Sequence, residues 1–225
     1  MKLTIHTATY NRAYILGKAY ESLCAQTCKD FEWIITDDGS TDGTDALVRG
    51  WMEKNNGFTI IYNPLSHVGV PRALNSGVNM ASNKWFMILD SDDHLVPGAV
   101  ERIMQLLPEI EGKEEFVGLG FARCHPDGSF MKNQTPKIDP SVGYVDITNI
   151  ERPLYNLDMD MCEVQRTDLL KKYPFQYWGT EKFAPEQLNY NAIALAGYKF
   201  RWRMDKLYVC DYLQDGLTRN DRLVK

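Results

Sequence analysis

The feature of this sequence that most constrains its fold is a regular alternation between short apolar segments and longer segments of helical periodicity. The apolar segments are rich in β-branched and aromatic residues, as buried strands are, and they span residues 2–7, 31–36, 58–62 and 85–89. Helices are predicted between them, at about residues 14–25, from the turn at 37–42 to about 54, and from Pro71 onward. This β-α-β-α-β-α-β order predicts an α/β fold with a central, mostly parallel sheet and helices on both faces.

Length and charge narrow the classes of protein further. The chain of 225 residues suits one large α/β domain with its own core. A net charge of -5 argues against binding to nucleic acid or anionic lipid, because such binding rests on clustered Lys and Arg. No apolar run approaches the ~20 residues of a membrane span, and no secretory pattern precedes the first strand. We therefore expect a cytoplasmic protein, with its five cysteines reduced.

Three carboxylates, Asp90, Asp92 and Asp93, directly follow the apolar segment 85–89. Carboxylates this close together repel and raise one another's pKa unless a cation lies near them. Ligands of open α/β sheets bind beyond the carboxyl ends of strands, where these residues are expected. A solvated acidic turn is the alternative, and it describes Asp93 well. It does not explain three acids after a buried strand, so we predict a metal site here.

Acidic residues also follow the second predicted strand. Gly39 suits a tight turn, and one residue among 40–42 suits the N-cap of the next helix. Capping accounts for one acid of this segment. Asp37 and Asp38 precede the turn and are left for a ligand.

Arg72 stands in the first turn of the helix that begins at Pro71. A cation at this end opposes the helix dipole, so a nearby anion such as a diphosphate explains it better than the helix does. A surface arginine with no ligand is the alternative.

In four successive motifs the sequence resembles the family 2 glycosyltransferases, which have the GT-A fold. The motifs are Thr9-Tyr10-Asn11-Arg12, Asp37-Asp38-Gly39-Ser40-Thr41-Asp42, Gly69 to Asn75, and Leu89-Asp90-Ser91-Asp92-Asp93. The resemblance implies a single Rossmann-like GT-A domain over residues 1–225. Residues 1–100 would form its nucleotide-sugar-binding half and residues 101–225 its acceptor-binding half.

The resemblance also implies which side chains contact a nucleotide-diphospho-sugar donor. The nucleotide-binding residues would be Thr9, Tyr10, Asn11, Arg12, Asp38, Arg72 and Asp90. Of these, Thr9, Tyr10 and Asp38 would hold the base and Asp90 the ribose, while Arg72 fits a phosphate or base contact.

The same resemblance implies a Mn²⁺ or Mg²⁺ ion that bridges the diphosphate. The element Asp90-Ser91-Asp92 would hold this ion. Asp92 and Asp93 both align with the metal-binding acid of the family, and the sequence leaves open which of them binds it.

A candidate general base lies in the second half, where a helix is predicted over residues 185–196. The residues predicted to pack inward are Leu188, Ala192, Leu195 and Ala196. Glu186 falls in the first turn, where the dipole stabilises a carboxylate by ~0.3–1 kcal/mol, so a structural role is the alternative. The family places an acidic pair here, before a segment like Gly197-Tyr198-Lys199-Phe200. This chain has Glu186-Gln187 instead, so Glu186 is the expected base, with Glu181 in reserve.

These features together predict a metal-dependent, inverting glycosyltransferase of polysaccharide biosynthesis. One base and direct displacement invert the anomeric centre. The expected donor is a UDP-sugar, and the acceptor is a saccharide or a lipid-linked saccharide, with peripheral membrane contact left open.

Two other classes remain. A nucleotidyltransferase that makes nucleotide-sugars normally opens with a Gly-rich phosphate loop, absent after the first strand here. A non-catalytic sugar-nucleotide-binding protein would need no base. Asp211 and Asp215 are further candidates for acceptor or metal contacts. Family members commonly continue beyond this length, so a truncated chain or the lack of a helical cap is expected.

Overall fold

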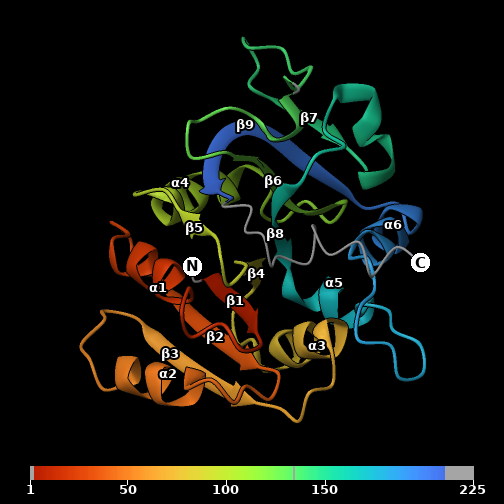
Figure 1. Ribbon diagram of the computed structural model, residues 1–225. Helices are drawn as coiled ribbons and strands as arrows, with labels where there is room; N and C mark the ends of the chain where they lie inside the picture. Colours follow the sequence, from red (N-terminus) through yellow and green to blue (C-terminus); the bar gives the residue numbers. More distant parts are fainter. Residues whose placement is uncertain (1–2, 134, 211–225) are drawn as a thin grey trace.

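The computed structural model describes residues 3–133 and 135–210 (Figure 1). Within these residues the strands form one nine-stranded sheet, in the order β3-β2-β1-β4-β8-β6-β9-β5, with β7 paired to β9. The strands are β1 (Leu3–Thr9), β2 (Phe31–Asp37), β3 (Thr59–Pro64), β4 (Trp85–Ile88), β5 (His94–Leu95), β6 (Phe116–Cys124), β7 (Tyr144–Ile147), β8 (Met161–Arg166) and β9 (Lys199–Val209). The sheet thus contains strands from both halves of the chain.

The α-helices are α1 (Gly17–Cys24), α2 (Thr44–Met52), α3 (Val70–Met80), α4 (Ala99–Leu106), α5 (Thr167–Lys172) and α6 (Gln187–Leu195). Short 3-10 helices are η1 (Leu107–Glu109), η2 (Met131–Asn133) and η3 (Asn149–Tyr155). The predicted β-α-β-α-β-α-β order of the first half is confirmed. The boundaries differ from the prediction by a few residues.

The direction of the strands decides where their ends meet. β3, β2, β1 and β4 are parallel to one another. β8 is antiparallel to both β4 and β6, so β6 runs in the direction of β4, and β9 is parallel to β6. The carboxyl ends of β1, β2, β4, β6 and β9 therefore lie along one edge of the sheet. The predicted α/β fold with a mixed, mostly parallel sheet is confirmed.

Helices cover both faces of the sheet. Trp33 of β2 stacks against Trp51 of α2, with ring centroids 5.8 Å apart. Trp33 is in register with Ile5 of β1, and the next residue, His6, points to the opposite face because side chains alternate along a strand. His6 meets α3 there, so closely that a Cβ atom on Gly77 would lie 2.2 Å from its ring. α2 and α3 therefore pack on opposite faces.

The inward face predicted for α6 is wrong. Leu188 and Leu195 are 39% and 80% exposed, respectively. The buried residues of α6 are Asn189, Tyr190, Ile193 and Ala194. That face is fixed by specific contacts: the Asn189 amide donates to the Tyr173 carbonyl, and the Tyr190 ring packs edge-on against Phe175.

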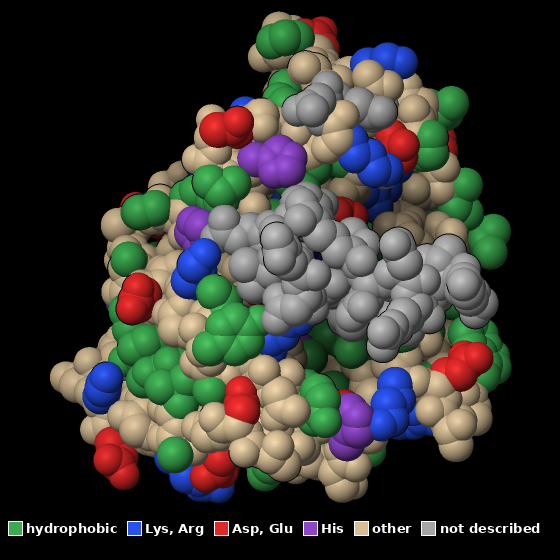
Figure 2. All heavy atoms as spheres, viewed as in Figure 1, with side chains coloured by type: hydrophobic (Ala, Val, Ile, Leu, Met, Phe, Trp, Pro, Cys, Tyr) green, Lys and Arg blue, Asp and Glu red, His purple; other side chains and the backbone are tan. Residues whose placement is uncertain are grey.

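On the face shown in Figure 2, the Lys and Arg side chains of the described residues are interspersed with Asp and Glu. Among the helices of the described residues, none combines the length and the apolar character that crossing a membrane requires.

Candidate functional site

A cavity of about 700 Å³ lies at the edge of the sheet where the parallel strands end. Its lining comes from the segments that follow β1, β2 and β4, from the end of β6, and from residues 181–186 before α6. The predicted site residues that line it are Thr9, Tyr10, Arg12, Asp38, Asp90, Asp92, Asp93, Glu181 and Glu186. Residues from both halves of the chain therefore share one site.

The loop after β1 gives the cavity an aromatic wall. Tyr10 is 43% exposed and stacks on His67, with ring centroids 4.1 Å apart and an angle of 21° between the rings. Thr9 is buried, and its hydroxyl has no hydrogen-bond partner in the described residues. The exposed ring of Tyr10 suits contact with a planar heterocycle.

Asn11, predicted to contact the nucleotide, does not line the cavity. Its backbone N–H donates to Ser40 Oγ at 2.8 Å, and its Oδ1 accepts from the Thr41 N–H at 2.8 Å. Asn11 has a φ of 52°, a left-handed conformation that Asn tolerates better than most residues. It therefore joins the loops that follow β1 and β2.

Asp38 lines the cavity and also holds a neighbouring loop. Its two carboxylate oxygens accept hydrogen bonds from the backbone N–H groups of Val68 and Gly69, at 2.6 and 2.9 Å. The Nδ1 atom of His67 lies 3.3 Å from Asp38 Oδ2. Asp38 thus fixes the residues that lead into α3.

Asp37, expected to be left for a ligand, is buried and structural. One oxygen accepts from the Ser40 N–H at 2.9 Å, and the other accepts from the Tyr62 hydroxyl at 2.5 Å. The expectation for Asp37 was wrong because it considered only helix caps and not the side chain of the neighbouring β3.

The acidic cluster after β4 is paired with an arginine from β6. Arg123 Nη1 donates to Asp90 Oδ2 at 2.7 Å and lies 3.7 Å from Asp93 Oδ2. The Tyr208 hydroxyl, at the end of β9, donates to the same Asp90 oxygen at 3.0 Å. Sequence reasoning missed Arg123. The sequence did carry a signal for this residue, because Arg123 is the single cation in an otherwise apolar segment and lies near its carboxyl end.

The fit of a divalent ion to this cluster can be judged from its donors. Carboxylate oxygens are hard ligands of the kind that Mg²⁺ and Mn²⁺ prefer. Asp90 and Asp93 already face Arg123, and among the described residues no group of three His, Cys, Asp or Glu side chains could hold a metal. The donor chemistry of Asp90, Asp92 and Asp93 therefore suits a divalent ion, while the described residues do not hold three such side chains in a metal-binding arrangement.

Glu186 faces the cavity from the start of α6. It is the N-cap residue of α6, one position before the expected first turn, and its carbonyl accepts from the Asn189 and Tyr190 N–H groups. The Tyr190 hydroxyl donates to Glu186 Oε2 at 3.1 Å. Burial raises the pKa of Glu186 to about 7, and the charge of Asp90 adds to this shift. A carboxylate with a pKa near neutrality suits proton transfer.

The two remaining predicted residues are Glu181 and Arg72, and they differ in whether they line the cavity. Glu181 is exposed on the loop before α6 and lines the cavity. Arg72 does not line it. The guanidinium of Arg72 donates instead to backbone carbonyls of Val68, Gly179 and Glu181. Asp211 and Asp215 lie outside the described residues.

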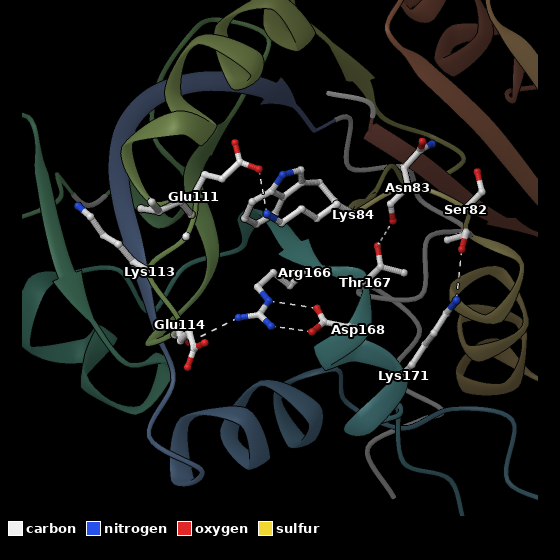
Figure 3. Close-up of a pocket in the computed structure, with 14 residues that line it drawn as sticks. Ser82, Asn83, Lys84, Glu111, Lys113, Glu114, Arg166, Thr167, Asp168 and Lys171 are labelled. Atoms are coloured by element: carbon white, nitrogen blue, oxygen red, sulfur yellow. Dashed lines mark hydrogen bonds and ion pairs between the residues drawn. The ribbon is translucent and has the colours of Figure 1, made fainter.

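A second cavity, of about 660 Å³, lies at the opposite edge of the sheet (Figure 3). Most of its charged groups are bonded within the protein. The contacts are Lys84 with Glu111 at 2.8 Å, Arg166 with Asp168 at 2.6 Å, and Lys171 with the Ala81 carbonyl at 3.2 Å. Figure 3 shows Arg166 turned toward Asp168 and Lys84 toward Glu111 across this space. The first cavity is the better candidate, because ligands of such sheets bind at the carboxyl ends of strands.

Solved structures share this fold. S. aureus TarS 1–349 in complex with UDP-GlcNAc matches with a TM-score of 0.77 and 20% identity over 98% of this chain and 61% of that chain. The mannosyltransferase PcManGT from Pyrobaculum calidifontis, in complex with GDP-Man and Mn²⁺, matches with a TM-score of 0.69 and 19% identity over 96% of this chain and 58% of that chain. These likenesses show the GT-A fold.

Among curated proteins, the GalNAc(5)-diNAcBac-PP-undecaprenol beta-1,3-glucosyltransferase of Campylobacter jejuni is 34% identical over 104 residues, which are 46% of this chain. A PGL/p-HBAD biosynthesis glycosyltransferase of Mycobacterium bovis is 37% identical over 87 residues, or 39% of this chain. Both matches span about a third, 34%, of the relative's own length.

The family model described as glycosyl transferase family 2 matches residues 4–173, a segment that includes β1 to β8 and the acidic cluster after β4. The chain therefore belongs to glycosyl transferase family 2.

Proposed function

We propose that this protein transfers a sugar from a nucleotide-diphospho-sugar to a saccharide or lipid-linked saccharide acceptor, with inversion at the anomeric carbon. The observation that carries the proposal is the opening of Glu186 into the same cavity as the loops after β1, β2 and β4. Donor-binding loops and a carboxylate with a pKa of about 7 are the two parts that such a reaction needs in one place.

The donor nucleotide lies along the carboxyl ends of β1, β2 and β4 in this proposal. Tyr10 and His67 offer stacked rings to the base, and Asp38 offers carboxylate oxygens beside them. Asp90, whose carboxylate is oriented by Arg123 and Tyr208, contacts the ribose. A UDP-sugar is the donor we favour, and TarS, which shares the fold, binds UDP-GlcNAc.

The diphosphate leaves with negative charge, which must be neutralised. A bound Mn²⁺ or Mg²⁺ supplies this neutralisation without a proton donor. Asp92, with Asp90 or Asp93, would hold the ion from the protein side. PcManGT, which shares the fold, has a solved structure in complex with GDP-Man and Mn²⁺, and this supports the proposal.

Glu186 accepts the proton of the acceptor hydroxyl as its oxygen bonds to the anomeric carbon and the bond to the diphosphate breaks. The hydrogen bond from Tyr190 orients one carboxylate oxygen and leaves the other for the acceptor. A lipid-linked acceptor is supported by the Campylobacter relative, whose name contains PP-undecaprenol.

The donor half of the proposal is tested by calorimetric titration of UDP into wild type and Asp92→Asn, each with Mn²⁺ or with EDTA. We expect tight binding only in wild type with Mn²⁺, because Asp92 would hold the ion that neutralises the diphosphate. Equal affinity in all four titrations would remove the metal from the mechanism. A thermal-shift screen of nucleotide-sugars with Mn²⁺ then identifies the donor, since a ligand that binds only the folded state raises the melting temperature.

A further inference from the structure

We propose that Arg72 is a positioning residue that fastens residues 175–186 to the start of α3 and thereby sets the place of Glu186 in the cavity. The proposal rests on the role of Glu186 in the proposed function. It replaces the phosphate or base contact expected for Arg72 from the sequence.

The guanidinium of Arg72 makes contacts of two kinds, hydrogen bonds to carbonyls and a stacking contact with a ring. Nη1 donates to the Val68 carbonyl at 3.0 Å and to the Glu181 carbonyl at 2.9 Å. Nη2 donates to the Gly179 carbonyl. The guanidinium carbon lies 4.0 Å from the centre of the Tyr177 ring. One side chain of α3 thus holds three residues of the segment that precedes Glu186.

Two neighbouring contacts fasten the same segment. The Val70 N–H donates to the Lys182 carbonyl at 2.8 Å, and a Cβ atom on Gly69 would lie 2.5 Å from Lys182 Cα, so the two backbones touch. Asn75 bonds the Phe175 backbone twice: its amide donates to the carbonyl, and its Oδ1 accepts from the N–H, each at 2.9 Å. The segment is therefore held by α3 and the loop before it from Phe175 to Lys182.

These contacts connect the loops proposed to bind the donor to the segment that leads to Glu186. Asp38 accepts from the N–H groups of Val68 and Gly69, and these residues in turn contact the 179–182 segment through Arg72 and Lys182. Glu186 follows only four residues after Lys182. A change in the 179–182 backbone therefore moves the carboxylate relative to the donor loops.

The chemistry of the contacts requires arginine. A guanidinium presents several N–H donors in one plane and stacks on an aromatic ring, so it can hold carbonyls of separate residues at once. A lysine ammonium is a point charge without the planar fork. Arg72 also does not line the cavity, and its donors already serve carbonyls, so a diphosphate would have to break these bonds to reach it.

The test uses Arg72→Lys and Asn75→Ala, because Asn75 fastens the same segment from a different position on α3 and does not line the cavity. Arg49→Lys is the matched control: Arg49 also lies over a tyrosine ring, 5.3 Å from the centre of Tyr62, but on α2. Measurements are UDP affinity by calorimetry, kcat with the identified donor, the pH dependence of kcat, and amide hydrogen exchange of residues 175–186.

We expect kcat to fall at least tenfold in both test variants, because small displacements of a catalytic group are costly, while UDP affinity stays within about twofold. Amide exchange of residues 175–186 should become faster at least tenfold. The acid limb of the pH profile should move to lower pH as water reaches Glu186. Arg49→Lys should match wild type in every measurement.

Two results would overturn the proposal. Weaker UDP binding in Arg72→Lys alone, with unchanged amide exchange, would make Arg72 a donor contact. Faster exchange with full kcat in both variants would show that the fastening does not position the base. If wild type transfers no sugar, the proposed function fails, and the exchange and affinity measurements still decide whether Arg72 fastens the segment.

Discussion

Glu186 combines proximity to the donor loops with an environment that disfavours its charge. Its pKa is about 7 in the folded protein, above the ordinary value of 4.5, chiefly because of burial. The folded state therefore holds the proton more tightly than the unfolded state does. The contribution of Glu186 to stability is greatest below about pH 4.5 and is lost as the pH rises through 7.

This linkage predicts that Glu186→Gln stabilises the protein at alkaline pH. At pH 8 the wild-type carboxylate is ionised in a partly buried site near Asp90 that disfavours its charge. The variant should melt at a higher temperature than wild type at pH 8, and the difference should vanish near pH 4.5. Thermal unfolding across this range measures it. If the difference in melting temperature between the variant and wild type is independent of pH, burial does not raise the pKa of Glu186.

Asp38 is predicted to read the base, besides holding the loop before α3. A carboxylate accepts from the N3–H of uracil, and cytosine has no such donor. Asp38→Ala should weaken both UDP and CDP, because the loop loosens, and should reduce the preference for UDP over CDP by about tenfold, the size of one charge-assisted hydrogen bond. Asp45→Ala, on the exposed side of α2, is the control. An unchanged preference would restrict Asp38 to its structural role.

At the scale of elements, α3 is central, because it packs on the sheet and carries Arg72 and Asn75. Its closest approach to the sheet is at Gly77, where a Cβ atom would lie 2.2 Å from the His6 ring. Gly77→Ala should therefore destabilise the fold, and overpacking of this kind typically costs about 1–3 kcal/mol.

Gly50→Ala is the matched control, because Gly50 lies within α2 and a Cβ atom there would have no neighbour within 4 Å. Alanine in an open helical position stabilises by about 0.5–1 kcal/mol. Denaturant unfolding of both variants gives the two free energies. If Gly77→Ala and Gly50→Ala change the free energy of unfolding equally, the contact between Gly77 and His6 adjusts to the extra methyl group without loss of stability.

Periodicity predicted the helices and strands of the first half well. It failed for α6, where both faces carry apolar residues. Leu188 and Leu195 form as regular a stripe as Tyr190 and Ile193, and only the contacts of Asn189 and Tyr190 with residues 173 and 175 decide between them. The spacing of apolar residues along the chain does not predict such tertiary contacts.

The site was predictable where one motif follows one strand, as for Asp90, Asp92 and Asp93. It was not predictable where partners come from distant segments. Arg123 and Tyr208 reach Asp90 only because β6 and β9 end at the same edge as β4, on the far side of the antiparallel β8. Strand order of this kind is set by long-range packing and not by local sequence.

At the scale of the molecule, one sheet brings two halves of the chain together at a single cavity. The first half supplies Tyr10, Asp38 and the acidic cluster, and the second half supplies Arg123 and Glu186. In the proposed reaction, the first set holds the donor while Glu186 activates the acceptor.

The most direct test of this claim is the rate of UDP release from the identified UDP-sugar in the presence of acceptor, measured with UDP affinity on wild type, Glu186→Gln and Glu181→Gln. General-base catalysis typically supplies about 10²–10⁴-fold in rate, so Glu186→Gln should lose that factor and keep its UDP affinity, and Glu181→Gln should remain near wild type. Full activity in Glu186→Gln with loss in Glu181→Gln would move the base to Glu181. Full activity in both variants would contradict the account.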